Sequence, residues 1–265
     1  STSRRQRQMC IRDSSFRFSP HLPPQMFAQP MESPIFSITW KYDSDEECIL
    51  LWYLTNHIRE NNQRPIIRLN LPYVPNARMD RVKNVDEVFT LKWFAKFINA
   101  LGFDRVFVSD PHSNVSTALF DRVCVIDAQS NIRRVLDKLN DKNVLLCYPD
   151  EGAAKRYSSQ AGREYVFCIK HRDWRTGKIE RLELTTPEKV ADRNVLIVDD
   201  ICSRGGTFTF TAKALKEAGA NEVFLYVTHC ESTIHSGTVL TDGLISHVFT
   251  TDSIYRGNSE MISLI

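Results

Sequence analysis

The chain has 265 residues, of which 42% are apolar and 25% charged, and this composition excludes a disordered or fibrous protein. Its 34 lysines and arginines against 32 acidic residues give a net charge of +2, too small to support general binding to nucleic acid or a membrane surface. No stretch is apolar enough to span a bilayer, and arginines and prolines occupy the first 30 residues, where a signal peptide needs an apolar stretch. We therefore expect a cytoplasmic protein of one large or two small domains.

Seven cysteines stand at positions 10, 48, 124, 147, 168, 202 and 230. Their number is odd, and no two of them form a CxxC pair. This spacing argues against a disulfide framework and against a zinc site. We expect these cysteines to be reduced and mostly buried.

Residues 1–34 are expected to be irregular. The first 14 residues are basic and without hydrophobic period, resemble translated sequencing-adapter sequence, and are excluded from the fold. Prolines then recur up to residue 34 and prevent a long helix. They are Pro20, Pro23, Pro24, Pro30 and Pro34.

From residue 35 onward, short apolar strands alternate with amphipathic helices. Strands are predicted at 35–39, 65–71, 105–109, 123–126, 144–147, 195–198, 222–227 and 245–249. Helices are predicted at 46–58, 88–101, 131–139 and 207–217. Residues 165–171 and 179–184 flank a polar tip and predict an exposed β-hairpin. The alternation predicts an α/β fold with a parallel sheet covered on both faces, and two similar halves that meet near residue 128.

The segment from Val195 to Thr207 carries the clearest chemistry. Four apolar residues of a buried strand lead to Asp199 and Asp200, and a glycine-rich turn then opens a helix. In a parallel sheet, ligands bind at the carboxyl ends of the strands. The backbone N–H groups of the turn and the Thr207 hydroxyl suit a phosphate, whereas the two acids suit a sugar diol or a metal bound to it. Together they indicate a ribose 5-phosphate group. The alternative is an ordinary polar turn, but two acids directly after a buried strand are costly without a use.

This segment resembles the ribose-phosphate motif of the type I phosphoribosyltransferase fold, and four further segments resemble motifs of phosphoribosyl pyrophosphate synthetases. PYVPNARMDR at 72–81 resembles PYxxYARQDR, and SDPHS at 109–113 resembles DLHS. YPDEGAAKR at 148–156 resembles SPDxGGxKR, and KHR at 170–172 falls where the family has KxR in a catalytic hairpin. Alone, each would more readily be a solvated loop, a turn histidine or a strand face. Their shared order supports the resemblance, which covers roughly residues 35–250.

The resemblance implies two similar domains of the phosphoribosyltransferase fold, each a parallel sheet covered by helices. An N-terminal domain at 35–128 would carry the ATP-binding segments, and a C-terminal domain at 129–265 the ribose-phosphate loop. Residues 1–34 would form an irregular or non-native leader. Against the family pattern, the chain lacks an opening strand and an adenine-contacting loop and ends early, so we expect a truncated fragment whose own activity is in doubt.

The implied activity is that of a ribose-phosphate diphosphokinase in nucleotide biosynthesis. The anomeric hydroxyl of ribose 5-phosphate would attack the β-phosphorus of Mg-ATP, and AMP would leave. The implied catalytic residues are Lys170, Arg172 and His112, the ATP-binding residues are Arg78, Asp80, Arg81 and His112, and the Mg2+ ligands are His112 and Asp150. The implied ribose-phosphate residues are Asp199, Asp200, Ser203, Arg204, Gly205, Gly206 and Thr207. No general base stands out. The family resemblance also implies a homo-oligomer.

The phosphate loop departs from the family's DDxxDTAGT. Ser203 replaces the third acid, and Arg204 and Gly205 follow it. The loop is therefore more positive, and Gly205 removes a side chain from its wall, so a larger group such as the diphosphate of ADP-ribose would fit. These sequence differences resemble the phage-type branch of the family, which pyrophosphorylates ADP-ribose for NAD synthesis. In the nucleotide segments, Met79 replaces a glutamine and Pro111 a leucine.

Two other functions remain as alternatives. A phosphoribosyltransferase shares the segment from Asp199 to Thr207 but leaves the ATP-like segments at 72–81 and 109–113 unexplained. A non-catalytic regulatory paralogue would lose the hairpin cations or the diol acids, and this sequence keeps both sets.

Overall fold

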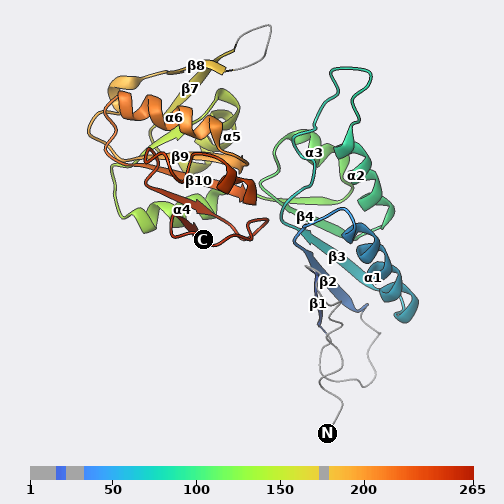
Figure 1. The fold of residues 1–265 in the computed structure, drawn as a ribbon. Coiled ribbons are helices and arrows are strands. Elements are labelled where there is room, and N and C mark those ends of the chain that lie inside the picture. Colours follow the sequence, from blue (N-terminus) through green and yellow to red (C-terminus); the bar gives the residue numbers. More distant parts are fainter. Residues whose placement is uncertain (1–15, 22–32, 173–178) are drawn as a thin grey trace. The chain divides into compact units, whose positions relative to one another are not determined.

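The computed structural model describes residues 16–21, 33–172 and 179–265. The chain divides into two compact units, residues 1–126 (unit 1) and 127–265 (unit 2), each built from a sheet with helices packed against it (Figure 1). None of the helices in the described residues is long and apolar enough to cross a membrane.

Unit 1 contains a five-stranded sheet in the order β1-β2-β3-β4-β5. Its strands are β1 (Phe16–His21), β2 (Ile35–Trp40), β3 (Ile66–Leu71), β4 (Arg105–Ser109) and β5 (Val123–Ile126). Its helices are α1 (Glu47–Asn61), α2 (Thr90–Ala100) and α3 (Asn114–Leu119). Strands β2 to β5 are parallel, and helical spacing directs Leu91, Phe94 and Ile98 of α2 into the core.

The irregular course expected through residue 34 is wrong at Phe16–His21, which form β1 and pair antiparallel with β2. This strand lies at the edge of the sheet. Proline is tolerated there because one side of an edge strand needs no ladder hydrogen bonds, so Pro20 does not prevent pairing.

Unit 2 contains a seven-stranded sheet in the order β12-β11-β10-β9-β6-β7-β8. Its strands are β6 (Leu145–Tyr148), β7 (Tyr165–Arg172), β8 (Ile179–Leu184), β9 (Val195–Cys202), β10 (Val223–Cys230), β11 (His247–Thr250) and β12 (Ile262–Leu264). Its helices are α4 (Gln129–Leu139), α5 (Glu151–Ala161) and α6 (Gly206–Glu217), with 3-10 turns η1 (Pro187–Lys189) and η2 (Ser232–Ser236). All its strand pairs are parallel except β7 with β8.

The central strand β9 is buried on both faces. Val195 and Ile197 pack into one core with α6, whereas Leu196 and Val198 pack into the other with α4 and α5. Burial on both faces explains why the strand reads as a continuous apolar run. The strand also extends beyond the predicted 195–198 to Cys202, so both acids belong to it.

The hairpin expected at 165–184 is confirmed as antiparallel β7 and β8, while its tip at 173–178 lies outside the described residues. Helix α5 was not predicted. Its sequence EGAAKRYSSQA contains mostly small and polar residues, which give no clear apolar stripe.

The cysteines of the described residues are free, as expected. Cys147, Cys168, Cys202 and Cys230 are buried in unit 2, and Cys48 is partly buried in unit 1. A hydrogen bond to Cys168, together with burial, raises the pKa of the Cys147 thiol well above its ordinary value. A hydrogen bond to Cys230, together with burial, does the same for the pKa of Cys202. These thiols are therefore protonated at neutral pH.

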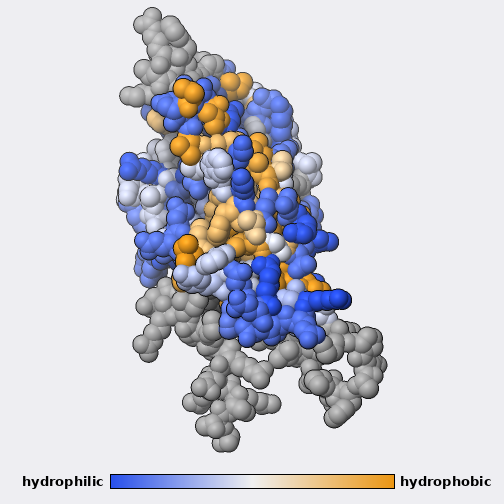
Figure 2. Space-filling model, turned by 90° about the vertical axis from the view of Figure 1, so that its right-hand side faces the viewer, coloured by the Kyte–Doolittle hydropathy of each residue, from blue (hydrophilic) through white to orange (hydrophobic). Residues whose placement is uncertain are grey.

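Helices α1 and α2 and the residues just before α2 leave large apolar side chains at the surface of unit 1. They are Ile49, Trp52 and Tyr53 of α1, Val88 before α2, and Trp93 of α2. Figure 2 views the molecule from the side on which α1 and α2 lie, and it shows apolar surface among charged residues. Contiguous apolar surface of this kind is typical of interaction sites.

Candidate active site

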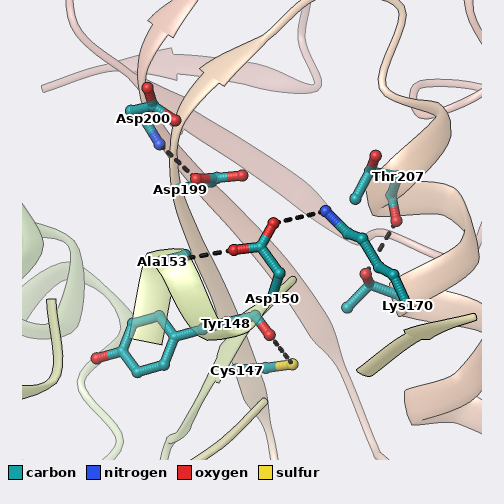
Figure 3. A network of polar contacts seen from close by, with 9 residues as sticks. Cys147, Tyr148, Asp150, Ala153, Lys170, Asp199, Asp200 and Thr207 are labelled. Atoms are coloured by element: carbon teal, nitrogen blue, oxygen red, sulfur yellow. Dashed lines mark hydrogen bonds and ion pairs between the residues drawn. The ribbon is translucent and has the colours of Figure 1, made fainter. Parts of the chain in front are cut away.

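Three predicted site residues lie at one edge of the unit 2 sheet. Asp150 follows β6, Lys170 lies near the end of β7, and Asp199 lies in β9. Strands β9, β6 and β7 are adjacent and parallel, so the sheet brings these side chains from distant parts of the sequence to the same edge. Figure 3 shows the Asp150–Lys170 pair next to the Asp199 carboxylate.

Asp150 uses its two carboxylate oxygens differently. As the N-cap of α5, it accepts a hydrogen bond from the Ala153 N–H at 2.9 Å through Oδ1. Lys170 Nζ lies 2.6 Å from Oδ2. Burial alone would raise the pKa of Asp150, but Lys170 and the backbone N–H outweigh it, and the pKa lies below its usual range. Asp150 is therefore an ionised carboxylate that both starts a helix and holds a lysine.

Asp199 and Asp200 point to opposite faces of β9, as consecutive strand residues do. The Asp200 side chain is only 5% exposed and lies 3.3 Å from Arg156 of α5. Asp199 accepts a hydrogen bond from the Asp200 N–H at 2.9 Å. Burial raises the pKa of Asp199 well above its usual range, and the charges of Asp200 and Asp150 raise it further. The environment of Asp199 therefore disfavours the ionised carboxylate and, within the described part of the chain, lacks a compensating positive charge.

The residues at this edge fit a magnesium ion. Asp150 and Asp199 supply the carboxylate oxygens that Mg2+ prefers, and a cation would offset the burial and the neighbouring negative charges that raise the pKa of Asp199. Within residues 16–21, 33–172 and 179–265, no three His, Cys, Asp or Glu side chains cluster as a closed metal site. An ion held by few protein ligands and by substrate phosphates needs no such cluster.

The predicted phosphate loop, residues 203–207, joins β9 to the N-terminus of α6. Gly205 is the N-cap, with a φ of +80° that favours glycine, and its carbonyl accepts a hydrogen bond from the Phe208 N–H at 2.8 Å. The first N–H groups of a helix have no intrahelical acceptor and form an anion site together with the helix dipole. Arg204 is exposed beside this turn, and Thr207 is partly buried in it.

Gly205 does not enlarge the loop. A Cβ atom built on it would lie 2.1 Å from Val239 Cγ2, so the Val239 side chain already fills that space. The expectation that Gly205 makes room for a larger 5-substituent is therefore wrong. Glycine is required here because of its φ and because of this contact.

The predicted nucleotide residues lie in unit 1. Their two segments follow the neighbouring strands β3 and β4, and the Ser109 N–H donates to the Pro72 carbonyl at 3.2 Å where they begin. Arg78 and Arg81 are exposed, and Arg81 Nε lies 3.2 Å from Asp80 Oδ1. His112 is partly buried. The two nucleotide segments thus start side by side, and their charged side chains lie in loops.

The phosphoribosyl transferase domain family matches residues 126–259. The ribose-phosphate pyrophosphokinase of Rhizobium meliloti is 30% identical over 220 residues, which cover 80% of this chain and 69% of that protein. The enzyme of the same name from Campylobacter jejuni is 29% identical over 215 residues, with 80% and 68% covered. The chain belongs to the ribose-phosphate pyrophosphokinase family.

A solved structure confirms the fold. Phosphoribosylpyrophosphate synthetase from Mycobacterium smegmatis shares 20% identity, and its structure matches with a TM-score of 0.65 over 82% of this chain and 72% of that one. The predicted α/β phosphoribosyltransferase fold and the family resemblance are thus confirmed. The ribose-phosphate pyrophosphokinase relatives give no support to the phage-type ADP-ribose branch.

One residue of this pyrophosphokinase family member was missing from the predicted site. Arg156 pairs with Asp200 and also lies over the Tyr157 ring at 5.5 Å. The signal in the sequence was the position of Arg156 in the segment that follows Asp150. The helix formed by this segment directs the Arg156 side chain toward the sheet. Lys155, beside it, instead pairs with Glu151 at the surface.

Proposed function

We propose that the chain transfers the diphosphoryl group of Mg-ATP to the anomeric hydroxyl of ribose 5-phosphate, giving phosphoribosyl pyrophosphate and AMP. The observation that carries this proposal is the edge of the unit 2 sheet, where Asp150, Lys170 and Asp199 stand beside a glycine-rich helix N-terminus. Membership of the ribose-phosphate pyrophosphokinase family supports it.

On the sugar side, residues 203–207 and the first turn of α6 hold the 5-phosphate through backbone N–H groups and the Thr207 hydroxyl. The ribose diol goes first to Asp199, because Asp200 is already paired with Arg156. Asp200 helps by orienting Asp199 through its backbone N–H. Holding the 2- and 3-hydroxyls fixes the direction of the 1-hydroxyl, which is the attacking group.

In the transfer itself, the protein mainly positions groups and stabilises charge, as expected for phosphoryl chemistry. Lys170 and Arg172 stabilise charge on the transferred phosphates. Before substrate binds, Asp150 holds the Lys170 ammonium in place at 2.6 Å. Asp150 would hold Mg2+ together with the nucleotide phosphates, and the ion would neutralise phosphate charge. His112 remains a predicted Mg2+ ligand on unit 1. Arg78, Asp80, Arg81 and His112 of unit 1 hold ATP.

Phosphorus NMR of the chain with Mg-ATP and ribose 5-phosphate tests this function. We expect the ATP signals to be replaced by those of AMP and a sugar diphosphate. Consumption of phosphoribosyl pyrophosphate with a free purine or pyrimidine base, and no reaction with ATP, would instead identify a phosphoribosyltransferase. Binding of both substrates without any turnover would identify a non-catalytic paralogue.

A second tube with ADP-ribose in place of ribose 5-phosphate tests the acceptor. Ribose 5-phosphate is the acceptor we propose, because Val239 fills the space beside Gly205. Arg204 is exposed beside the loop and adds positive charge to it. Faster turnover of ADP-ribose than of ribose 5-phosphate would contradict this choice.

We also propose that the chain self-associates through unit 1. The exposed apolar side chains of α1 and α2, among them Trp52 and Trp93, support this proposal. Sedimentation velocity is expected to show an oligomer for the wild type and a smaller species for the Trp52→Glu, Trp93→Glu double variant. A wild type that sediments as a monomer at micromolar concentration would contradict it.

A further inference from the structure

The segment between β10 and β11 packs against the phosphate loop. We call residues 231–243 the bracing loop. Two of its side chains, Ile234 and Val239, are fully buried in the core that also contains α6. The bracing loop is also tied to the end of β9, because the Glu231 N–H donates to the Cys202 carbonyl at 2.8 Å. It is therefore a fixed part of unit 2, and it adjoins the residues that we propose bind the 5-phosphate.

Gly237 brings the backbone of the bracing loop against Arg204. Its φ of −101° is one that any residue adopts, so backbone conformation does not require glycine there. A Cβ atom at this position would lie 1.8 Å from the Arg204 carbonyl oxygen and 2.8 Å from its carbonyl carbon. Glycine is therefore required by the contact itself.

Val239 makes the matching contact on the next residue of the phosphate loop. A Cβ atom on Gly205 would lie only 2.1 Å from Val239 Cγ2, so the valine leaves no room for it. Gly205 has a φ of +80°, which starts α6 and sets the direction of its first N–H groups. The bracing loop thus supports two consecutive residues of the phosphate loop by close packing.

Hydroxyl groups fix both ends of this contact. The Ser203 and Thr233 hydroxyl oxygens are 2.9 Å apart, and Thr233 donates to Glu231 Oε2 at 3.2 Å. On the helix side, Thr209 of α6 donates to Asp242 Oδ2 at 3.0 Å. The bracing loop is therefore hydrogen-bonded to Ser203, the first residue of the phosphate loop, and to Thr209 in the first turn of α6.

We infer that Gly237, Val239 and Thr233 are positioning residues for ribose 5-phosphate: they hold the phosphate loop in its binding conformation without contacting the sugar. This inference rests on the proposed function. It predicts that changes in the bracing loop weaken sugar affinity much more than they affect ATP affinity or turnover at saturating sugar.

Gly237→Ala is the principal test, with ribose 5-phosphate binding measured by calorimetry. Its Cβ must push the Arg204 carbonyl away and shift the adjoining phosphate loop. Loss of one hydrogen bond to the charged phosphate lowers affinity roughly 10- to 100-fold. We expect an increase of that size in Kd and in KM for ribose 5-phosphate, with KM for ATP and kcat nearly unchanged. Gly162→Ala is the control. It has a positive φ but no atom within 4 Å of a Cβ, so it lowers stability without altering sugar affinity.

Thr233 gives a second test that does not depend on the folding of Gly237→Ala. Thr233→Val keeps the shape and removes the hydroxyl, so we expect sugar affinity to fall roughly fivefold, as for one neutral hydrogen bond. Thr233→Ser is expected to restore it. In the Ser203→Ala background, Thr233→Val is expected to have no further effect, since Thr233 acts through Ser203.

The outcomes separate this inference from the proposed function. A wild type that binds no ribose 5-phosphate would contradict the proposed function, on which the inference rests. A wild type that binds it, with a Gly237→Ala variant of equal affinity, would overturn the inference alone. If Gly237→Ala does not fold, wild-type affinity in Thr233→Val overturns it.

Discussion

The two units carry their predicted functional residues in different ways. In unit 2, Asp150, Lys170 and Asp199 stand on or next to adjacent parallel strands and interact with one another. In unit 1, Arg78 and Arg81 are exposed on a loop that follows β3. The unit 2 residues lie near the carboxyl ends of strands, and the unit 1 residues follow such an end. The difference therefore lies in how firmly each side chain is held.

The difference indicates which part is organised before the substrate arrives. Side chains on rigid elements are held close to their working geometry, whereas exposed loop residues become ordered by the ligand. We therefore expect variants in unit 2 to affect turnover and sugar binding strongly. Variants in unit 1 should affect ATP affinity, and more mildly.

The largest effect is expected for Lys170→Ala. Removing one preorganised group that stabilises transition-state charge costs on the order of 3–4 kcal/mol, a roughly 10²- to 10³-fold loss in kcat. The same loss is expected for Arg172→Ala. Steady-state kinetics would measure it, with Lys155→Ala as the control, because Lys155 is an exposed cation paired with Glu151. A near-normal kcat in Lys170→Ala would show that the β7–β8 hairpin does not take part in the transfer.

A smaller effect is expected for Asp199→Asn. The amide replaces the carboxylate acceptor while keeping its shape, and a hydrogen bond to a charged group contributes roughly 1.5–3 kcal/mol. Affinity for ribose 5-phosphate should fall about 10- to 100-fold, and that for a non-hydrolysable ATP analogue should stay the same. Calorimetry would measure both. Unchanged sugar affinity argues that Asp199 does not hold the diol.

We expect Asp199→Asn, which weakens sugar binding, to increase the stability of the folded protein. The pKa of Asp199 is raised in the folded state, whereas in the unfolded chain the carboxyl ionises near pH 4. Above about pH 4 the folded state therefore binds more protons than the unfolded state, and wild-type stability falls as the pH rises through this window. The Tm of Asp199→Asn minus the Tm of the wild type should therefore increase from pH 4 to pH 7. A Tm difference that is the same at both pH values would show that the Asp199 carboxyl is not destabilised.

The smallest effect is expected for Arg78→Ala in unit 1. Because Arg78 is exposed, its contact with ATP is solvated, and we expect KM for ATP to rise roughly three- to tenfold with kcat unchanged. Arg105→Ala, an exposed arginine at the opposite end of β4, is the control. A fall in kcat equal to that of Lys170→Ala would show that the comparison between the units is wrong.

Much of this architecture was predictable because it depends on local hydrophobic patterns. Strand β4 has its predicted bounds, and β3 and α2 lie within two residues of theirs. The convergence of Asp150, Lys170 and Asp199 was also predictable, because parallel strands end at the same edge.

The parts that were missed depend on tertiary contacts. The N-cap of α5 is Asp150, but the helix lacks an apolar stripe in its sequence and is stabilised by packing of Ala153, Ala154 and Tyr157 against the sheet. The pairing of Arg156 with Asp200 joins residues 44 positions apart. The role of Gly205 likewise depends on Val239, which no local pattern links to it.

The buried cysteines of unit 2 provide a natural reporter of its opening. Only thiolates react with alkylating reagents, and Cys147 and Cys202 are both inaccessible and held as thiols. Their alkylation therefore requires unit 2 to open, and its rate under native conditions reports how often this happens. Partly buried Cys48, whose pKa burial raises to about 11, provides a reference in unit 1. Mass spectrometry of alkylated peptides would thus time the opening of unit 2 against the reaction of Cys48, without any introduced label.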